Sequence, residues 1–225
     1  MADPIPATLL PATLLPGDGL GPEIMDVVVR VLERLGSPFA WDVQEGGMAA
    51  IASCGDPLPP ALLDSIRRTR SALKGPLTTP IGGGFRSVNV RLREEFQLYA
   101  NLRPNRTMVP GGRYEDINIV VVPENLEGLY VGFEHYIPIG ADPHGAAIFE
   151  AVHGSAPDIA GKGVANPLAV LMAAAWMPEH CGLHEMAGRL RAALDHTVLV
   201  AAVRTLDLGG TADTAGFAGA VLQAL

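Results

Sequence analysis

Residues 117–122 read INIVVV, an almost continuous apolar run that constrains the fold more than any other feature of this chain. A run of this kind, rich in β-branched side chains, is typical of a strand that is buried on both faces. We therefore expect this segment to be an interior strand of a sheet that is covered on both sides.

The segments before this run alternate between two patterns. Strand-like patterns occupy residues 11–15, 39–44, 71–74 and 99–103. Helical spacing occupies residues 22–35, 46–53, 60–68 and 88–95. A glycine-rich loop system at 149–167 is followed by helices, which we expect at 166–176, 185–203 and 214–225. Strands that alternate with helices, followed by further helices, predict an α/β architecture.

The composition excludes several classes of protein. The 225 residues are 48% hydrophobic, enough for one sizeable core or two small lobes. The net charge of −8 comes without a basic cluster, so we expect no nucleic-acid partner. The longest apolar run, 168–177, is too short to span a bilayer, which argues against a membrane protein. The two cysteines form no CxxC motif, which fits a cytoplasmic protein.

Residues 74–103 carry the strongest functional signal, KGPLTTPIGGGFRSVNVRLREEFQLYANLR. Arginines bind carboxylates through paired N–H groups, hydroxyls and an amide add fixed hydrogen bonds, and a triple glycine allows close approach of the backbone. Together these groups suit a small polyanion with several carboxylates. The alternative is a solvated helix with ordinary arginines after a flexible loop, which fits any single arginine but not the whole string.

This string closely resembles the substrate loop of the NAD-dependent isocitrate dehydrogenases, in the isocitrate/isopropylmalate dehydrogenase family. The resemblance implies that the carboxylates of isocitrate are held by Ser87, Asn89, Arg93 and Arg103. The serine and asparagine before Arg93 favour isocitrate over isopropylmalate. The resemblance also places Thr79 on the substrate side of the pocket, and Lys74 and Thr78 on the cofactor side.

A second string, IFEAVHGSAPDIAGKGVANP at residues 148–167, resembles the adenosine-binding loop of the same family. By this resemblance His153 stacks on or bonds the adenine, Asn166 bonds its edge, and Gly154 also belongs to the cofactor site. Asp158 would accept hydrogen bonds from both ribose hydroxyls and repel a 2′-phosphate, which implies NAD as the cofactor. Tyr130, in PENLEGLY, matches the catalytic tyrosine and proposed acid of the family; a structural tyrosine at a domain edge is an equally good interpretation.

The two resemblances adjoin near Ile148, where the family has a long intervening segment. That segment carries a catalytic lysine, the aspartates that bind Mg2+ or Mn2+, and the clasp that interlocks two subunits. No string in this chain resembles it, and Glu134, Asp142 and Glu150 lack the spacing of those aspartates. A separate departure is Pro123, which stands where the family motif has an arginine before Glu-Asn, a third group that holds a carboxylate. Because the metal is the electron sink for decarboxylation, we expect little or no isocitrate dehydrogenase activity.

The resemblance implies a layered α/β sheet of the family type, not a Rossmann fold, with the small clasp domain reduced or absent. Residues 1–122 and 148–225 would form the large cofactor-binding domain, and 123–147 a remnant of the dimerisation domain. We expect uncovered apolar surface at 117–122 and 168–177, and hence a homo-oligomer, such as a dimer, or pairing with a full-length homologous subunit.

Three functional hypotheses follow. The chain is an enzyme by ancestry, from a family that oxidatively decarboxylates isocitrate to 2-oxoglutarate. It is alternatively a non-catalytic subunit that binds isocitrate or NAD, or a deletion product without a function of its own.

Overall fold

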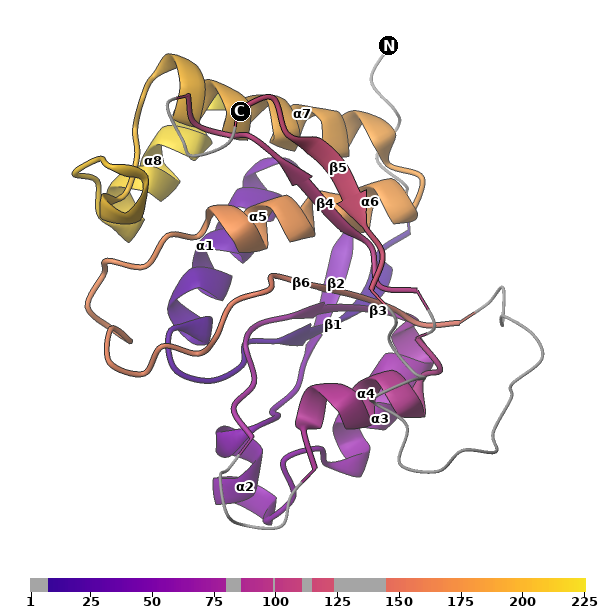
Figure 1. Ribbon diagram of the computed structural model, residues 1–225. Helices are drawn as coiled ribbons and strands as arrows, with labels where there is room; N and C mark the ends of the chain where they lie inside the picture. The colour runs from indigo at the N-terminus through magenta and orange to yellow at the C-terminus, as the bar shows by residue number, and fades with distance from the viewer. Residues whose placement is uncertain (1–7, 80–85, 99, 111–114, 124–144) are drawn as a thin grey trace.

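The computed structural model describes residues 8–79, 86–98, 100–110, 115–123 and 145–225 as an α/β structure built on a parallel sheet (Figure 1). The sheet has four strands in the order β2-β1-β3-β6. The strands are β1 (Leu10–Leu15), β2 (Phe39–Val43), β3 (Ser71–Lys74) and β6 (Ala147–Glu150). The helices are α1 (Gly21–Arg34), α2 (Met48–Cys54), α3 (Pro60–Thr69), α4 (Val88–Glu95), α5 (Leu168–Ala174), α6 (Trp176–His180), α7 (His184–Asp195) and α8 (Thr214–Ala224).

Helices cover both faces of the sheet, and the alternation of side chains along β1 explains why. Ala12 and Leu14 belong to one hydrophobic core, whereas Leu15 belongs to the other. Successive side chains of a strand point to opposite faces, so a strand buried on both sides supplies two cores. The α/β layered fold that the sequence predicts is therefore confirmed.

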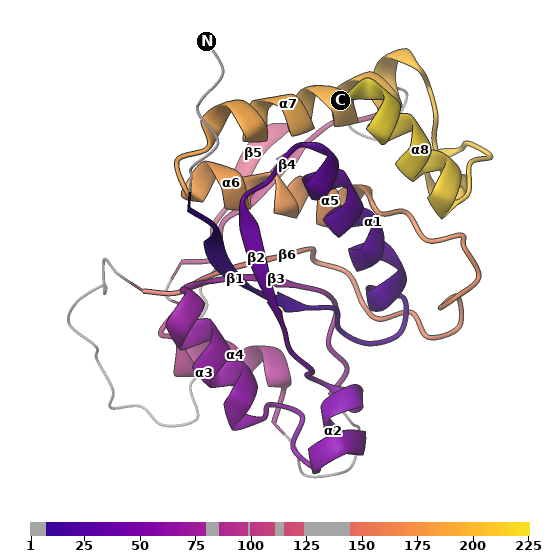
Figure 2. The same cartoon turned by 180° about the vertical axis from the view of Figure 1, so that it is seen from behind.

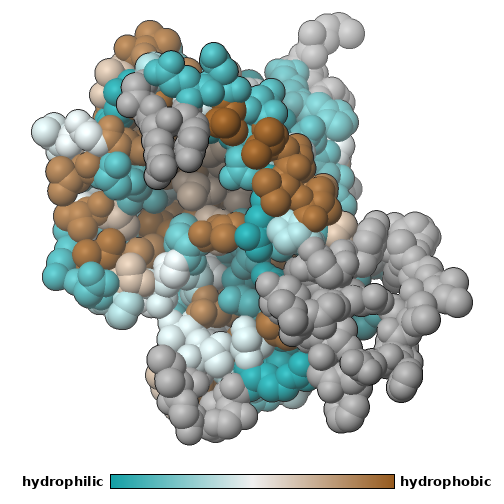
Figure 3. Space-filling model, in the orientation of Figure 1, coloured by the Kyte–Doolittle hydropathy of each residue, from teal (hydrophilic) through white to brown (hydrophobic). Residues whose placement is uncertain are grey.

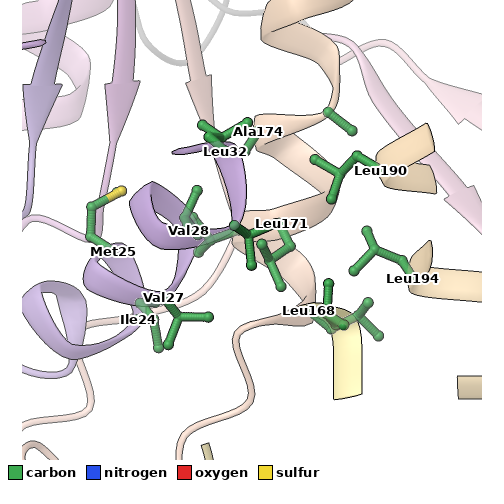
Figure 4. Packing of buried hydrophobic residues seen from close by; sticks show 14 of the residues in the cluster. Ile24, Met25, Val27, Val28, Leu32, Leu168, Leu171, Ala174, Leu190 and Leu194 are labelled. Atoms are coloured by element: carbon green, nitrogen blue, oxygen red, sulfur yellow. The ribbon is translucent and has the colours of Figure 1, made fainter. Parts of the chain in front are cut away.

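The larger core lies between α1 and the helices of the second half of the chain (Figure 4). Pro22 stands in the first turn of α1, where its missing N–H costs nothing. From there Ile24, Val28 and Leu32 recur at helical spacing and are fully buried. They face α5 and α7, which contribute Leu168, Leu171, Ala174, Leu190 and Leu194.

The apolar run at 168–177 is part of this core, so the expectation that it would be exposed is wrong for most of its length. Leu171, Ala174 and Met177 have no exposed surface. Trp176 is 42% exposed, with Arg191 stacked on its ring. The structure also divides the run between α5 and α6 at Ala175, and continues α7 into a π-helical turn, His196–Val200.

The smaller core lies on the opposite face of the sheet, under α3 and α4 (Figure 2). Leu62 and Ile66 of α3 pack with Val88 and Leu92 of α4 against Leu15. This packing fixes the start of α4 relative to the ends of β1 and β3.

A polar network runs beside this core. Thr13 Oγ1 lies 2.7 Å from Ser65 Oγ and 2.8 Å from Thr69 Oγ1. Ser65 Oγ in turn donates to Asp42 Oδ2 at 2.6 Å. The hydrogen bond from Ser65 lowers the pKa of Asp42, helped by a second bond from Gln44 and by the charge of Arg68.

The strand predicted at 117–122 is present. Its predicted burial on both faces is wrong, whereas the uncovered apolar surface that was also expected there is observed. Asn118–Val121 forms β5, which pairs antiparallel with β4 (Arg103–Arg106) in a separate two-stranded sheet. Ile119 is 52% exposed and Val120 59% exposed, and Figure 3 shows a hydrophobic strip where Figure 1 draws β5. Within the described residues β5 pairs with β4 alone, so an apolar run that predicts a strand does not guarantee the neighbours that bury it.

Strand β4 also begins where the sequence predicted a strand to end, at Arg103. Within the described residues no helix is both long and apolar enough to cross a bilayer.

Candidate functional site

The loops that follow β1, β3 and β6 leave the sheet on the same side (Figure 1). The carboxyl ends of parallel strands meet at one edge, where open α/β sheets bind their ligands. The loop after β3 begins the predicted substrate string, and the loop after β6 begins the predicted cofactor string. Both therefore lie at this edge.

The substrate loop is tied to the start of α4. Thr79 Oγ1 accepts a hydrogen bond from Val88 N at 3.1 Å. Ser87 precedes α4 directly, is exposed, and makes no side-chain capping bond. Asn89 Oδ1 is buried and has no hydrogen-bond partner among the described residues. A buried polar atom without a partner is uncommon and favours a ligand at that position.

The arginines of this region divide into two classes. Arg86 pairs with Glu94 at 2.7 Å, Arg91 pairs with Asp56 at 3.1 Å, and Arg106 pairs with Asp195. The half-buried Arg93 has no acidic partner in the part of the chain that the structure describes. Arg103 likewise has none there; its Nε only approaches Asn101 Oδ1, at 3.4 Å. Among the described arginines between residues 86 and 106, the two predicted to hold carboxylates are thus the two without an acidic partner.

Lys74 ends β3 and is buried, with 4% of its surface exposed. Its ammonium group pairs with Glu150 on the neighbouring strand β6 and donates to Gly75 O at 3.0 Å. A buried cation requires such compensation. Glu150 was not predicted as a site residue, because only the register of β3 and β6 places it opposite Lys74.

Thr78 connects the two predicted loops. Its Oγ1 lies 2.7 Å from Ser155 Oγ, two residues after His153 in the cofactor loop. Its backbone N–H donates to Asp18 Oδ2 at 2.7 Å. Neither Ser155 nor Asp18 was predicted as a site residue, although Ser155 lies in the glycine-rich loop system at 149–167.

The cofactor loop places its predicted residues in different environments. His153 Nδ1 lies 3.0 Å from Gly154 O, whereas its Nε2 is buried and has no partner among the described residues. Gly154 and Asp158 are exposed. Asn166 Nδ2 donates to Asp207 Oδ2 at 2.9 Å, and Asn166 Oδ1 accepts from Leu168 N at 2.9 Å. Asp207 is a further neighbour that sequence analysis missed.

The unpartnered Nε2 of His153 can bond a ligand, and Asp158 presents a carboxylate to solvent along the same loop. The predicted acid Tyr130 lies outside the described residues. Among those described, no three His, Cys, Asp or Glu side chains gather as a metal site would need.

The structure joins the loop with predicted substrate residues to the loop with predicted cofactor residues. Thr78 and Thr79 lie in the loop that follows Lys74, and Thr79 bonds to the start of α4, the helix that carries Asn89 and Arg93. The bond between Thr78 and Ser155 joins this loop to the one with His153 and Gly154. Arg103 is on β4, in the second sheet.

Comparison with known proteins identifies the family of this chain. The profile described as isocitrate/isopropylmalate dehydrogenase matches residues 12–142 and 137–221. The catalytic subunit 5 of mitochondrial NAD isocitrate dehydrogenase from Arabidopsis thaliana is 29% identical, over 99% of this chain and 89% of the relative. The alpha subunit of the mitochondrial NAD enzyme from Bos taurus is also 29% identical, over 90% and 87%.

The alignment with the Arabidopsis subunit runs over 338 positions although this chain has 225 residues. The remaining aligned positions are gaps in this chain. The chain is therefore shorter than this relative, although the alignment covers most of the relative's length.

Solved structures agree on the fold. Isocitrate dehydrogenase from Methylococcus capsulatus superposes with a TM-score of 0.86 at 32% identity, covering 96% of this chain and 99% of the other. A beta-decarboxylating dehydrogenase from Thermococcus kodakarensis superposes with a TM-score of 0.79 at 26% identity, covering 96% of each chain. The chain therefore belongs to the isocitrate/isopropylmalate dehydrogenase family.

Proposed function

We propose that this chain binds isocitrate and NAD in the manner of its family but turns isocitrate over slowly or not at all. The family reaction is the oxidative decarboxylation of isocitrate to 2-oxoglutarate. This chain would supply the part of the site that holds the two ligands. Residues 1–122 and 148–225 would form the cofactor-binding domain, in a cytoplasmic protein.

The observation that carries the proposal is which arginines between residues 86 and 106 have acidic partners and which do not. Arg86, Arg91 and Arg106 are paired with acidic side chains, whereas Arg93 and Arg103 have no acidic partner among the described residues. A cation with no internal partner can bind the carboxylate of a ligand in a charge-assisted pair. Asn89 lies on α4, the helix that carries Arg93, and its Oδ1 is buried without a partner among the described residues. This oxygen can accept a hydrogen bond from a hydroxyl of that ligand.

On the cofactor side, NAD when bound supplies the hydride acceptor of the reaction. His153 Nε2 would bond the adenine, and Asn166 would bond its edge. Asp158 is exposed on the same loop, where its carboxylate would accept hydrogen bonds from the ribose hydroxyls. The same negative charge would oppose the 2′-phosphate of NADP.

Low turnover is proposed from the sequence. The family carries its catalytic lysine and metal-binding aspartates in a segment that nothing in this chain resembles. The alignment with the Arabidopsis subunit runs over 338 positions, more than the 225 residues of this chain. A homodimer of this chain would not restore those groups, because both copies lack them. Loss of such a catalytic unit typically lowers the rate by orders of magnitude.

Calorimetric titration of the purified chain with isocitrate and with NAD, each with and without Mg2+, tests the proposal. We expect both ligands to bind, with no metal-dependent production of NADH. Arg93→Met should abolish isocitrate binding. Arg91→Met is the matched control, because it makes the same substitution on the same helix at an arginine that is already paired with Asp56. This variant should still bind isocitrate.

Robust metal-dependent NADH production would refute the low turnover and support a complete enzyme. Failure of the chain to bind either ligand would support a deletion product without a function of its own. Binding only in the presence of a full-length relative would instead identify a subunit of a hetero-oligomer.

A further inference from the structure

Asp18 lies in the turn after β1, is nine-tenths buried, and accepts hydrogen bonds from two different segments. Its Oδ1 accepts from Met48 N at 3.0 Å and from Ala49 N at 3.3 Å, at the start of α2. Its Oδ2 accepts from Thr78 N at 2.7 Å, in the substrate loop. No lysine or arginine pairs with this carboxylate among the described residues, so backbone N–H groups compensate its charge.

The turn that carries Asp18 also touches both ligand loops through its backbone. Asp18 N donates to Pro76 O at 2.7 Å, and Leu20 N donates to Ser155 O at 2.8 Å. A Cβ at Gly17 would lie 2.3 Å from Pro76 O, and one at Gly19 would lie 2.0 Å from Ser155 O. These approaches are possible only at glycine, so the turn is packed directly onto the two loops.

We propose that Asp18 is a positioning residue, which holds the substrate loop (75–79) and the cofactor loop (151–167) in a fixed relative position. Its carboxylate fixes Thr78 N, the side chain of Thr78 reaches Ser155, and Leu20 of the same turn holds Ser155 O. The inference rests on the proposed binding of isocitrate and NAD. It adds a residue that neither ligand needs to touch.

The isosteric variant Asp18→Asn tests the role, because its amide nitrogen cannot accept the bond that an oxygen accepts now. Amide hydrogen exchange without ligands, followed by NMR, should become faster in three segments together: 47–49, 77–79 and 153–156. Isocitrate and NAD should both bind roughly tenfold more weakly, the scale of one lost charge-assisted hydrogen bond.

Glu23→Gln is the matched control. Glu23 Oε2 accepts from Gly161 N at 3.0 Å, and its Oε1 accepts from Thr214 Oγ1 at 3.0 Å. Glu23 therefore contacts the cofactor loop but not the substrate loop. We expect this variant to weaken NAD binding and leave isocitrate binding unchanged. If Asp18→Asn acted only by a general loss of stability, the two variants would change the binding of both ligands in the same way.

Faster exchange confined to 47–49 in the Asp18→Asn protein would overturn the proposal, because Asp18 would then only support α2. If the wild-type chain binds neither ligand, the proposed function fails, but the exchange pattern still decides the role of Asp18.

If the Asp18→Asn variant does not fold, a measurement on the wild-type chain tests the proposal instead. In low concentrations of denaturant, the amides of Leu20, Met48 and Thr78 should open together with one common free energy. Independent opening of Thr78 would overturn the proposal.

Discussion

The hydroxyl oxygens of Thr78 and Ser155 lie 2.7 Å apart and join the loop after β3 to the loop after β6. One loop carries the residues predicted for isocitrate, and the other carries those predicted for NAD. Hydride transfer requires the two ligands to be held next to each other. This hydrogen bond therefore fixes the separation on which any shared site depends.

Gly19→Ala should destabilise the chain and weaken NAD binding. Gly19 has a φ of +61°, and a Cβ there would lie 2.0 Å from Ser155 O, so the turn must move away from the cofactor loop. We expect a loss of about 1–3 kcal/mol in the free energy of unfolding, measured by urea denaturation. Gly188→Ala on α7, where a Cβ meets nothing within 4 Å, should instead stabilise the helix slightly.

Asp158→Ala should weaken NAD binding about tenfold and reduce the preference for NAD over NADP. The variant removes the carboxylate that would accept bonds from the ribose and repel the 2′-phosphate. Titration with both dinucleotides measures the change. Asp26→Ala, an exposed acid on α1 that pairs with Arg30, is the control for loss of surface charge. Equal affinities in wild type and Asp158→Ala would contradict the role of Asp158.

Asp42 should make the stability of the chain sensitive to acid. Hydrogen bonds from Ser65 and Gln44, together with the charge of Arg68, lower its pKa in the folded state below the ordinary value of 3.8. A lowered folded-state pKa contributes stability that is complete above the unfolded-state value and is lost as the pH falls through the folded-state value. Stability should therefore fall below about pH 4.

Asp42→Asn isolates this contribution. At neutral pH the variant should be about 1–2 kcal/mol less stable, because Ser65 and Arg68 lose an ionised acceptor. Its stability should also decline less between pH 5 and pH 3 than that of the wild type. Urea denaturation across this pH range makes the comparison; parallel curves for the two proteins would contradict the assignment.

Leu190→Ala should be among the most destabilising core substitutions, at about 2–5 kcal/mol. Leu190 has no exposed surface and packs in the core between α1, α5 and α7 (Figure 4). Leu206→Ala removes the same atoms from a side chain that is 81% exposed and should change stability by less than about 0.5 kcal/mol. Thermal or urea denaturation of both variants tests the difference.

Val120→Lys should reduce self-association. Val120 is 59% exposed on β5, next to the exposed Ile119 and Val121, and an apolar strand of this kind promotes pairing between chains. A lysine at this position opposes such pairing. Sedimentation velocity should show smaller species for this variant than for the wild type. Val200→Lys, at a valine that is 72% exposed outside β5, should leave the distribution unchanged; a monomeric wild type would contradict the prediction.

The sequence by itself determined the local elements and the family. Ser71–Lys74 and Val88–Glu95 have the predicted bounds, and α1 begins in the turn that holds Pro22. Each depends on the spacing of apolar residues, or on a proline or glycine, within a few residues of the chain. The predicted roles of Arg93, Asn89 and His153 also came from short strings.

The tertiary structure alone decided burial and partnership. The run at 117–122 reads as an interior strand, yet β5 is exposed, because burial depends on neighbours that its own residues do not specify. The pairs Lys74–Glu150 and Thr78–Ser155 join residues more than seventy positions apart in the chain. Strand register and the close approach of Gly17 and Gly19 place these groups together, and neither is visible in a local pattern. The same packing placed Asp18, an ordinary turn residue in the sequence, between the two ligand loops.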